Sequence, residues 1–194
     1  MNVAKSLLYL NKSLGILALS LLLASCGLVK LNGFSNDLDK LSIEQREQIV
    51  YKTVLSDKEM IAHKDENTIF MVTGETLLQA LPRDKATLVY LFAPYCQGSG
   101  CIPTSTFRKL ATDKGFRPLV VLEYITPEIV GTTQGLYGMN DRAYGSRFVG
   151  FYRKKFYNDL TGLSSNSKEF PFSRYILIPQ GDSTAKGKPY NFPE

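Results

Sequence analysis

Three runs of mostly apolar residues constrain the fold of this 194-residue chain more than any other feature. They are residues 87–92 (TLVYLF), 119–124 (LVVLEY) and 175–178 (YILI). Continuous apolar strands are typical of parallel or mixed sheets, because helices cover both faces of such sheets. Candidate helices lie between the runs. The pattern therefore predicts an α/β layer sandwich, in which a central mixed sheet of about four strands carries helices on both sides.

Four shorter segments fit the same architecture. Residues 68–72 are expected to form a short strand. Residues 75–81 are expected to form a two-turn helix that stops before Pro82, because proline cannot continue a helix. A second helix is expected over residues 102–114. Residues 125–139 are rich in glycine, threonine and proline, which predicts a long loop.

A long helix is expected over residues 140–160, because aromatic residues recur there at helical spacing. This aromatic stripe is expected to face the core, and the basic residues of the same helix are expected to form its solvated side. Contact of that basic side with anionic lipid headgroups or an acidic partner is the alternative. The stripe comprises Tyr144, Phe148, Phe151, Tyr152 and Phe156, and the basic residues are Arg142, Arg147, Arg153, Lys154 and Lys155.

The N-terminal segment has the layout of an export signal. Lys5 and Lys12 precede an apolar run of eleven residues, 14–24, which has the length of a signal-peptide core and is short for a membrane span. The run ends in Leu23-Ala24-Ser25-Cys26, which resembles the lipobox of bacterial lipoproteins. The resemblance implies that residues 1–25 are removed and that Cys26 carries a lipid anchor. A plain secretory signal or an uncleaved anchor is the alternative.

A lipid anchor implies a location in the bacterial cell envelope, attached to a membrane and facing outside the cytoplasm. Two or more acyl chains make such attachment stable. Disulfides persist in this compartment. Of the three cysteines, lipidation of Cys26 leaves one pair, Cys96 and Cys101. Residues 26–41 show no sustained periodicity and are expected to form a tether.

Residues 42–65 are expected to form an N-terminal helical extension. Ser42 and Gln45 have the spacing of a capping box, so a helix is expected from Ser42 to about Leu55. His63 lies in a charged stretch and is expected to be a solvated surface residue. At the other end of the chain, residues 182–194 are polar and are expected to form a weakly structured tail.

The cysteine pair follows the first of the apolar runs. The segment reads Thr87-Leu-Val-Tyr-Leu-Phe-Ala-Pro-Tyr95-Cys96, then four residues, then Cys101 at the start of the next helix. This arrangement resembles the active-site region of the thioredoxin-like family, with tyrosine where that family has tryptophan. The resemblance covers residues 66–181. It implies a thioredoxin-like three-layer sandwich, and it implies that Pro171, before the last strand, is the family's proline opposite the cysteines.

The spacing between the cysteines departs from the family's pattern of two intervening residues. Residues five positions apart in a helix point about 140° apart, so a helical segment cannot join Cys96 to Cys101. A disulfide needs Cα atoms within roughly 4.4–6.8 Å. Gly98 and Gly100 permit a loop that brings them together. We therefore expect Cys96 on a loop and Cys101 at the helix entrance, where unpaired N–H groups lower the pKa of a cysteine.

Three interpretations of the pair remain open. In the first, the protein is a membrane-tethered thiol–disulfide oxidoreductase acting on the thiols or disulfides of envelope proteins, with Cys96 attacking and Cys101 resolving. In the second, it is a non-catalytic thioredoxin-fold lipoprotein that binds an envelope partner, and the disulfide is structural. A loop this short gives a structural disulfide little entropic benefit. In the third, the pair binds a metal, as in copper-delivering thioredoxin-like proteins, but no histidine follows His63.

Composition excludes several other classes of protein. Hydrophobic residues make up 44% and charged residues 21%, as in ordinary globular proteins. The net charge of +5 is mild, and no basic stripe with interleaved aromatic residues predicts nucleic-acid binding. The sequence has no phosphate-binding Gly-Lys-Ser/Thr loop and no dinucleotide fingerprint, so no cofactor is expected.

Overall fold

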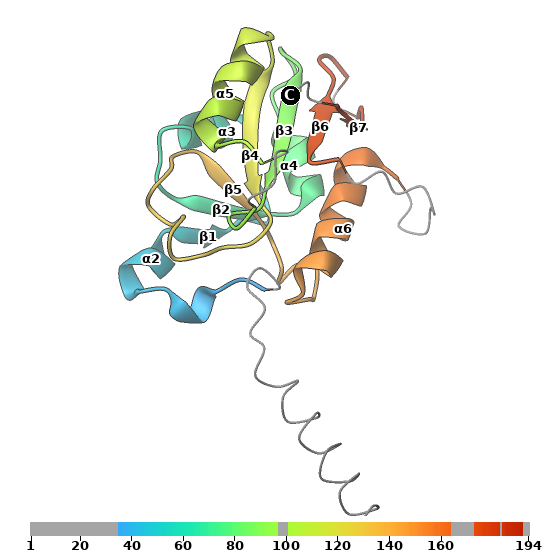
Figure 1. Ribbon diagram of the computed structural model, residues 1–194. Helices are drawn as coiled ribbons and strands as arrows, with labels where there is room; N and C mark the ends of the chain where they lie inside the picture. The colour runs from blue at the N-terminus through green and yellow to red at the C-terminus, as the bar shows by residue number, and fades with distance from the viewer. Residues whose placement is uncertain (1–34, 97–100, 164–172, 183, 192–194) are drawn as a thin grey trace, which may run out of the picture. The chain divides into compact units, whose positions relative to one another are not determined.

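The computed structural model describes residues 35–96, 101–163, 173–182 and 184–191 (Figure 1). Its centre is a seven-stranded mixed sheet in the order β1–β2–β5–β4–β3–β6–β7. The first five of these strands, β1 to β5, are parallel to their neighbours, whereas β6 is antiparallel to β3 and β7 is antiparallel to β6. The strands are β1 Ile49–Tyr51, β2 Ile69–Val72, β3 Thr87–Phe92, β4 Arg117–Leu122, β5 Leu136–Met139, β6 Tyr175–Ile178 and β7 Lys188–Pro189.

Helices cover both faces of the sheet, so the prediction of an α/β sandwich with a mixed sheet is confirmed (Figure 1). One face packs against α3 (Asp57–His63), α4 (Gly74–Ala80) and α6 (Val149–Thr161), and the other packs against α5 (Thr104–Asp113). Alternate side chains of β3 enter the two cores, since successive residues of a strand point to opposite faces. Val89 and Leu91 face α6, whereas Leu88 and Tyr90 face α5.

The apolar runs form the strands that they predict. Strands β3 and β6 have the predicted bounds, and β4 begins two residues earlier than expected. The expected loop over residues 125–139 is wrong at its end, because Leu136–Met139 is strand β5, paired with β2 and β4. Gly138 interrupts the apolar pattern of this strand, so the sequence does not indicate it. Gly138 is needed there because a Cβ atom would collide with the Met71 side chain of β2.

The region before β2 contains more strand than expected. The capping box at Ser42 and Gln45 is confirmed, but its helix, α2 (Ile43–Glu47), is only five residues long. The expected continuation to Leu55 is wrong, because residues 49–51 leave the helix and form β1 beside β2. The β-branched side chains of Ile49 and Val50 suit a strand better than a helix.

The long aromatic helix is shorter than predicted, because α6 begins at Val149. Residues 140–148 form turns instead. Tyr144, Tyr152 and Phe156 are buried as expected. Phe148 and Phe151 are 71% and 52% exposed, so their assignment to the core is wrong. The late start of the helix leaves these two rings on its outer side.

The end of the expected tether packs on the sandwich. Asn36 Oδ1 accepts a hydrogen bond from the Ile125 backbone N–H at 2.7 Å, and the Asp37 N–H donates to Ile125 O at 2.9 Å. A short 3-10 helix, η1 (Leu38–Lys40), follows, and Leu41 is buried in the same core as α5. In the expected tail, residues 188–189 form β7. None of the helices in the described ranges is long and apolar enough to cross a membrane.

Candidate functional site

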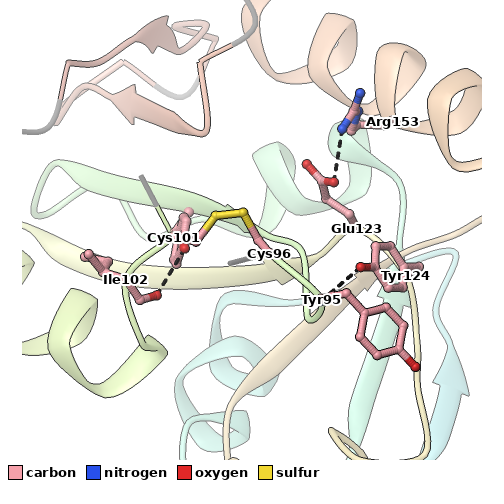
Figure 2. The surroundings of a disulfide bond; sticks show 8 residues. Tyr95, Cys96, Cys101, Ile102, Glu123, Tyr124 and Arg153 are labelled. Carbon is pink, nitrogen blue, oxygen red and sulfur yellow. Dashed lines mark hydrogen bonds and ion pairs between the residues drawn. A yellow bond between two sulfur atoms is a disulfide. The ribbon is translucent and has the colours of Figure 1, made fainter. Parts of the chain in front are cut away.

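The cysteine pair lies between the carboxyl end of β3 and the start of α5. Cys96 follows the end of β3 by four residues, and Cys101 precedes α5 by three. The two form a disulfide with Cα atoms 5.8 Å apart, so the predicted turning back of the chain is confirmed (Figure 2). The Cys96 backbone N–H donates to Ala93 O at 2.9 Å, which closes a turn directly after the strand. Both cysteines are half-buried.

The neighbouring strand β4 fixes the position of this turn. The Glu123 N–H donates to Phe92 O at 2.9 Å, which extends the ladder between β3 and β4 by one residue. The Tyr124 hydroxyl accepts a hydrogen bond from the Tyr95 backbone N–H at 3.0 Å (Figure 2). The two tyrosine rings stack with their centroids 5.8 Å apart. Tyr95, the residue before Cys96, is therefore anchored to Tyr124, just after the end of β4.

A second tyrosine holds the chain after Cys101. The Tyr90 hydroxyl, from β3, donates to Ile102 O at 3.1 Å. The Tyr90 ring stacks on Tyr175 of β6, with centroids 5.0 Å apart, and also contacts Phe107 of α5. Both arms of the cysteine loop are thus attached to residues of the central sheet.

A buried acid lies at the same edge of the sheet. Only 3% of the Glu123 side chain is exposed, and its Oε2 is 3.1 Å from Nη1 of Arg153, on α6 (Figure 2). The other carboxyl oxygen, Oε1, is buried without a hydrogen-bond partner among the described residues. Burial raises the pKa of Glu123 above its ordinary value, and the charges of Arg153 and Arg174 oppose this rise. Glu123 therefore keeps a proton to a higher pH than an exposed glutamate does.

Glu123 is not among the site residues expected from the sequence, although the sequence contains a signal for it. It is the one acid inside the run 119–124, whose other residues are apolar or aromatic. An acid in such a run is either at a strand end or buried, and here it is both. Arg153, the partner of Glu123, is expected on the solvated side of the helix, but two thirds of its side chain is buried.

His63 contradicts its expected place on the surface. Its side chain is fully buried, its ring stacks on Phe70 with centroids 3.9 Å apart, and Nε2 is 2.8 Å from Leu136 O. The charged residues that follow His63 in the sequence indicate a surface position and give no sign of this burial. Met60 and His63 are three residues apart on α3, so one face of this short helix carries both toward the sheet.

Two of the expected site residues, Cys26 and Pro171, lie outside the described residues. Within the described ranges, no group of three His, Cys, Asp or Glu side chains is placed to hold a metal ion.

The described site thus combines a disulfide, a tyrosine anchor and a buried carboxyl at one edge of the sheet. A disulfide at a strand end can exchange with thiols that reach either sulfur, and a carboxyl of raised pKa can hold a proton at a higher pH than an exposed carboxyl does. In comparisons with known proteins, no family model, no curated protein and no solved structure matches this chain.

Proposed function

We propose that this protein is a membrane-tethered thiol–disulfide oxidoreductase of the bacterial cell envelope, built on a thioredoxin-like domain. The observation that carries the proposal is the position of the disulfide Cys96–Cys101, between the end of the buried strand β3 and the start of α5. The disulfide closes a loop of only six residues, so its entropic contribution to stability is small. Exchange chemistry accounts for such a bond better than stabilisation does.

The strand next to β3 also supports a thioredoxin-like domain. Strand β6 runs antiparallel to β3, and the Leu91 N–H donates to Arg174 O at 2.8 Å. Residue 174 therefore lies beside the end of β3 that leads to Cys96. The proposal assigns to Pro171, three residues earlier, the role of the family's proline opposite the cysteines.

In the proposed reaction, a substrate dithiol reduces the disulfide by exchange. A substrate thiolate attacks Cys96 Sγ, the bond between the cysteines breaks, and Cys101 leaves as a thiolate. The second substrate thiolate then attacks the substrate sulfur of the mixed disulfide and expels Cys96 as a thiolate. Two electrons pass to the cysteine pair, and the protons of the substrate thiols pass to the cysteines or to water. The reverse sequence, with Cys96 as the attacking thiolate, reduces a substrate disulfide.

The proposed membrane attachment is through a lipid on Cys26. The residues that pack on the sandwich begin near Asn36, about ten residues after Cys26. A segment of this length spans at most about 35 Å, which limits the distance between Asn36 and a lipid on Cys26.

The reduction potential and the trapping of mixed disulfides test the exchange function. We expect the pair in the full chain to have a potential between about −120 and −270 mV, the range of exchange proteins. We expect Cys101→Ser to trap a mixed disulfide on Cys96 in envelope extracts, because the resolving thiol is missing. Thiol labelling, gel shift and mass spectrometry report both results.

The matched control is Cys96→Ser, which is expected to trap nothing, because it removes the sulfur that forms the mixed disulfide. A potential below about −300 mV with no trapped partner would identify a structural disulfide, and with it the non-catalytic binding protein. Trapping by Cys96→Ser but not by Cys101→Ser would reverse the two roles.

The lipid anchor has its own test. Replacement of Cys26 by Ala is expected to abolish both cleavage after Ser25 and labelling with a palmitate analogue. Cys96→Ala is expected to retain both. Unchanged processing, with no label on the wild-type chain, would refute the anchor and leave the cysteine chemistry unaffected.

A further inference from the structure

A partly enclosed cavity lies at the amino ends of β4 and β5, at the opposite edge of the sheet from the cysteine pair. Its volume is about 440 Å³, within the range of small-molecule sites. The walls are mainly apolar and include Ile61 of α3, Tyr137 of β5, and Pro118 and Leu119 of β4. This composition suits an apolar group.

Arg108 of α5 lines this cavity and also an adjoining recess of about 560 Å³. The recess is polar, with side chains such as Thr104, Thr132 and Gln134 in its wall. Lys64 is the other residue shared by the two spaces. The pair of spaces therefore has an apolar compartment, a polar compartment and two cationic side chains where they meet.

The hydrogen bonds of Arg108 leave part of its guanidinium without a partner. Its Nη2 donates to Gln134 O at 2.7 Å and to Gly135 O at 3.1 Å, whereas its buried Nε has no partner in the described part of the chain. No carboxylate of the described residues lies within ion-pairing distance of Arg108. Burial lowers the pKa of Arg108, and the interaction with Tyr137 opposes this shift without cancelling it.

The other two cations that line the apolar cavity have acidic partners. Arg117 Nη2 is 2.7 Å from Asp84, and Lys64 Nζ is 3.8 Å from Asp65. A half-buried cation without an anion is costly, and a carboxylate from a ligand would supply the missing charge and accept hydrogen bonds from the guanidinium.

We propose that this cavity binds an amphiphilic carboxylate, with its carboxylate on Arg108 and its apolar tail among Ile61, Leu119 and Tyr137. The guanidinium stands where the polar and apolar compartments meet, which is where the head of such a ligand joins its tail. The site is independent of the cysteine pair, so it binds its ligand in both redox states.

Dodecanoate, below its micelle concentration, is the probe, and the full chain carrying Cys26→Ser is the protein. We expect saturable binding of one dodecanoate per chain by isothermal titration calorimetry. Arg108→Gln is expected to raise the dissociation constant at least about tenfold, since charge-assisted hydrogen bonds to the carboxylate are lost. Ile61→Trp, which fills the apolar compartment and keeps Arg108, is expected to weaken binding as well.

Lys109→Gln is the matched control, because Lys109 is the next residue of α5, is 77% exposed and pairs with Asp113. It is expected to bind dodecanoate like the wild type. Circular dichroism confirms that each variant is folded. Equal affinity of Arg108→Gln and Lys109→Gln would overturn the proposal. So would equal binding of dodecyltrimethylammonium, which has the same tail and the opposite charge, or unchanged binding by Ile61→Trp.

Discussion

At the carboxyl ends of β3 and β4 the described residues form a disulfide and a buried ion pair, whereas at the amino ends of β4 and β5 they line a cavity. Each edge holds a charged side chain that is taken out of water, Glu123 at the first and Arg108 at the second. Each of these side chains also has one buried atom without a hydrogen-bond partner in the described residues.

The two edges differ in where the opposite charge comes from. Arg153 and Arg174 act on Glu123, whereas no described carboxylate pairs with Arg108. Opposite charges within the chain already interact with Glu123. Arg108 has no such partner among the described residues, so an anionic ligand could supply the opposite charge. The missing partner of Arg108 is the basis of the ligand site proposed at the amino edge, whereas the exchange chemistry proposed at the carboxyl edge rests on the disulfide.

The largest effect on stability is expected at the amino edge, from His63→Ala. Its ring is buried between Phe70 and Tyr137, and Nε2 is hydrogen-bonded to Leu136 O. Truncation leaves a cavity and an unpaired carbonyl, so the free energy of unfolding is expected to fall by about 3 kcal/mol. Urea denaturation measures this loss.

Lys64→Ala, at the next and exposed residue, is the control and is expected to change stability by less than about 0.5 kcal/mol. Equal stability of His63→Ala and the wild type would contradict the burial of this ring.

A smaller loss is expected at the carboxyl edge, from Arg153→Gln. Removal of one partner of a buried ion pair costs roughly 3–5 kcal/mol. Arg153 is one third exposed, Arg174 still acts on Glu123, and the carboxyl can take up a proton. We therefore expect a loss of about 1.5 kcal/mol in the free energy of unfolding, after discounting for solvent screening.

Two variants sharpen this result. Arg147→Gln, at an exposed residue just before α6, is expected to leave stability unchanged. Arg108→Gln is expected to cost less than Arg153→Gln, because it leaves no carboxylate unpaired in the described residues. A larger loss from Arg108→Gln than from Arg153→Gln, measured by urea denaturation, would contradict the proposed difference in charge pairing between the two edges.

The sequence predicts the strands that are uninterrupted apolar runs better than the other strands. Strand β3 is a continuous apolar run whose residues are buried on both faces of the sheet, and β6 is a continuous apolar run buried on one face and half-buried on the other; apolar length detects both strands directly. Strands β1 and β5 are short, and β5 contains Gly138, whose value lies in its close approach to Met71. A contact of that kind depends on residues far apart in the chain and leaves no local pattern.

The candidate site follows the same rule. The cysteine loop was predictable, because the spacing and the glycines of residues 96–101 determine which geometries close a disulfide. The pairing of Glu123 with Arg153 and the place of His63 were not. Each depends on how a helix is rotated against the sheet. Charged neighbours in the sequence favour a surface position for both Arg153 and His63.

The smallest expected effect is a change in how stability depends on pH, and it tests whether Glu123 is buried. Burial raises the pKa of Glu123, so between its ordinary value of 4.5 and the raised value the folded state binds more protons than the unfolded state. This contribution to stability is therefore complete below pH 4.5 and is lost as the pH rises through the raised pKa. Glu123→Gln is expected to remove that decline.

Glu59 provides the matched comparison, because its environment acts in the opposite direction. Lys52 and Ser56 lower the pKa of Glu59 to about 2, so its contribution is present above pH 4.5 and is lost as the pH falls toward 2. Glu59→Gln is thus expected to flatten the acid side of the profile, and Glu123→Gln the side above pH 4.5. Urea denaturation across this pH range measures both slopes. If Glu123→Gln leaves the dependence of stability on pH unchanged, the Glu123 carboxyl is solvated. The carboxyl edge then has no buried acid that holds a proton above the ordinary pKa of a glutamate.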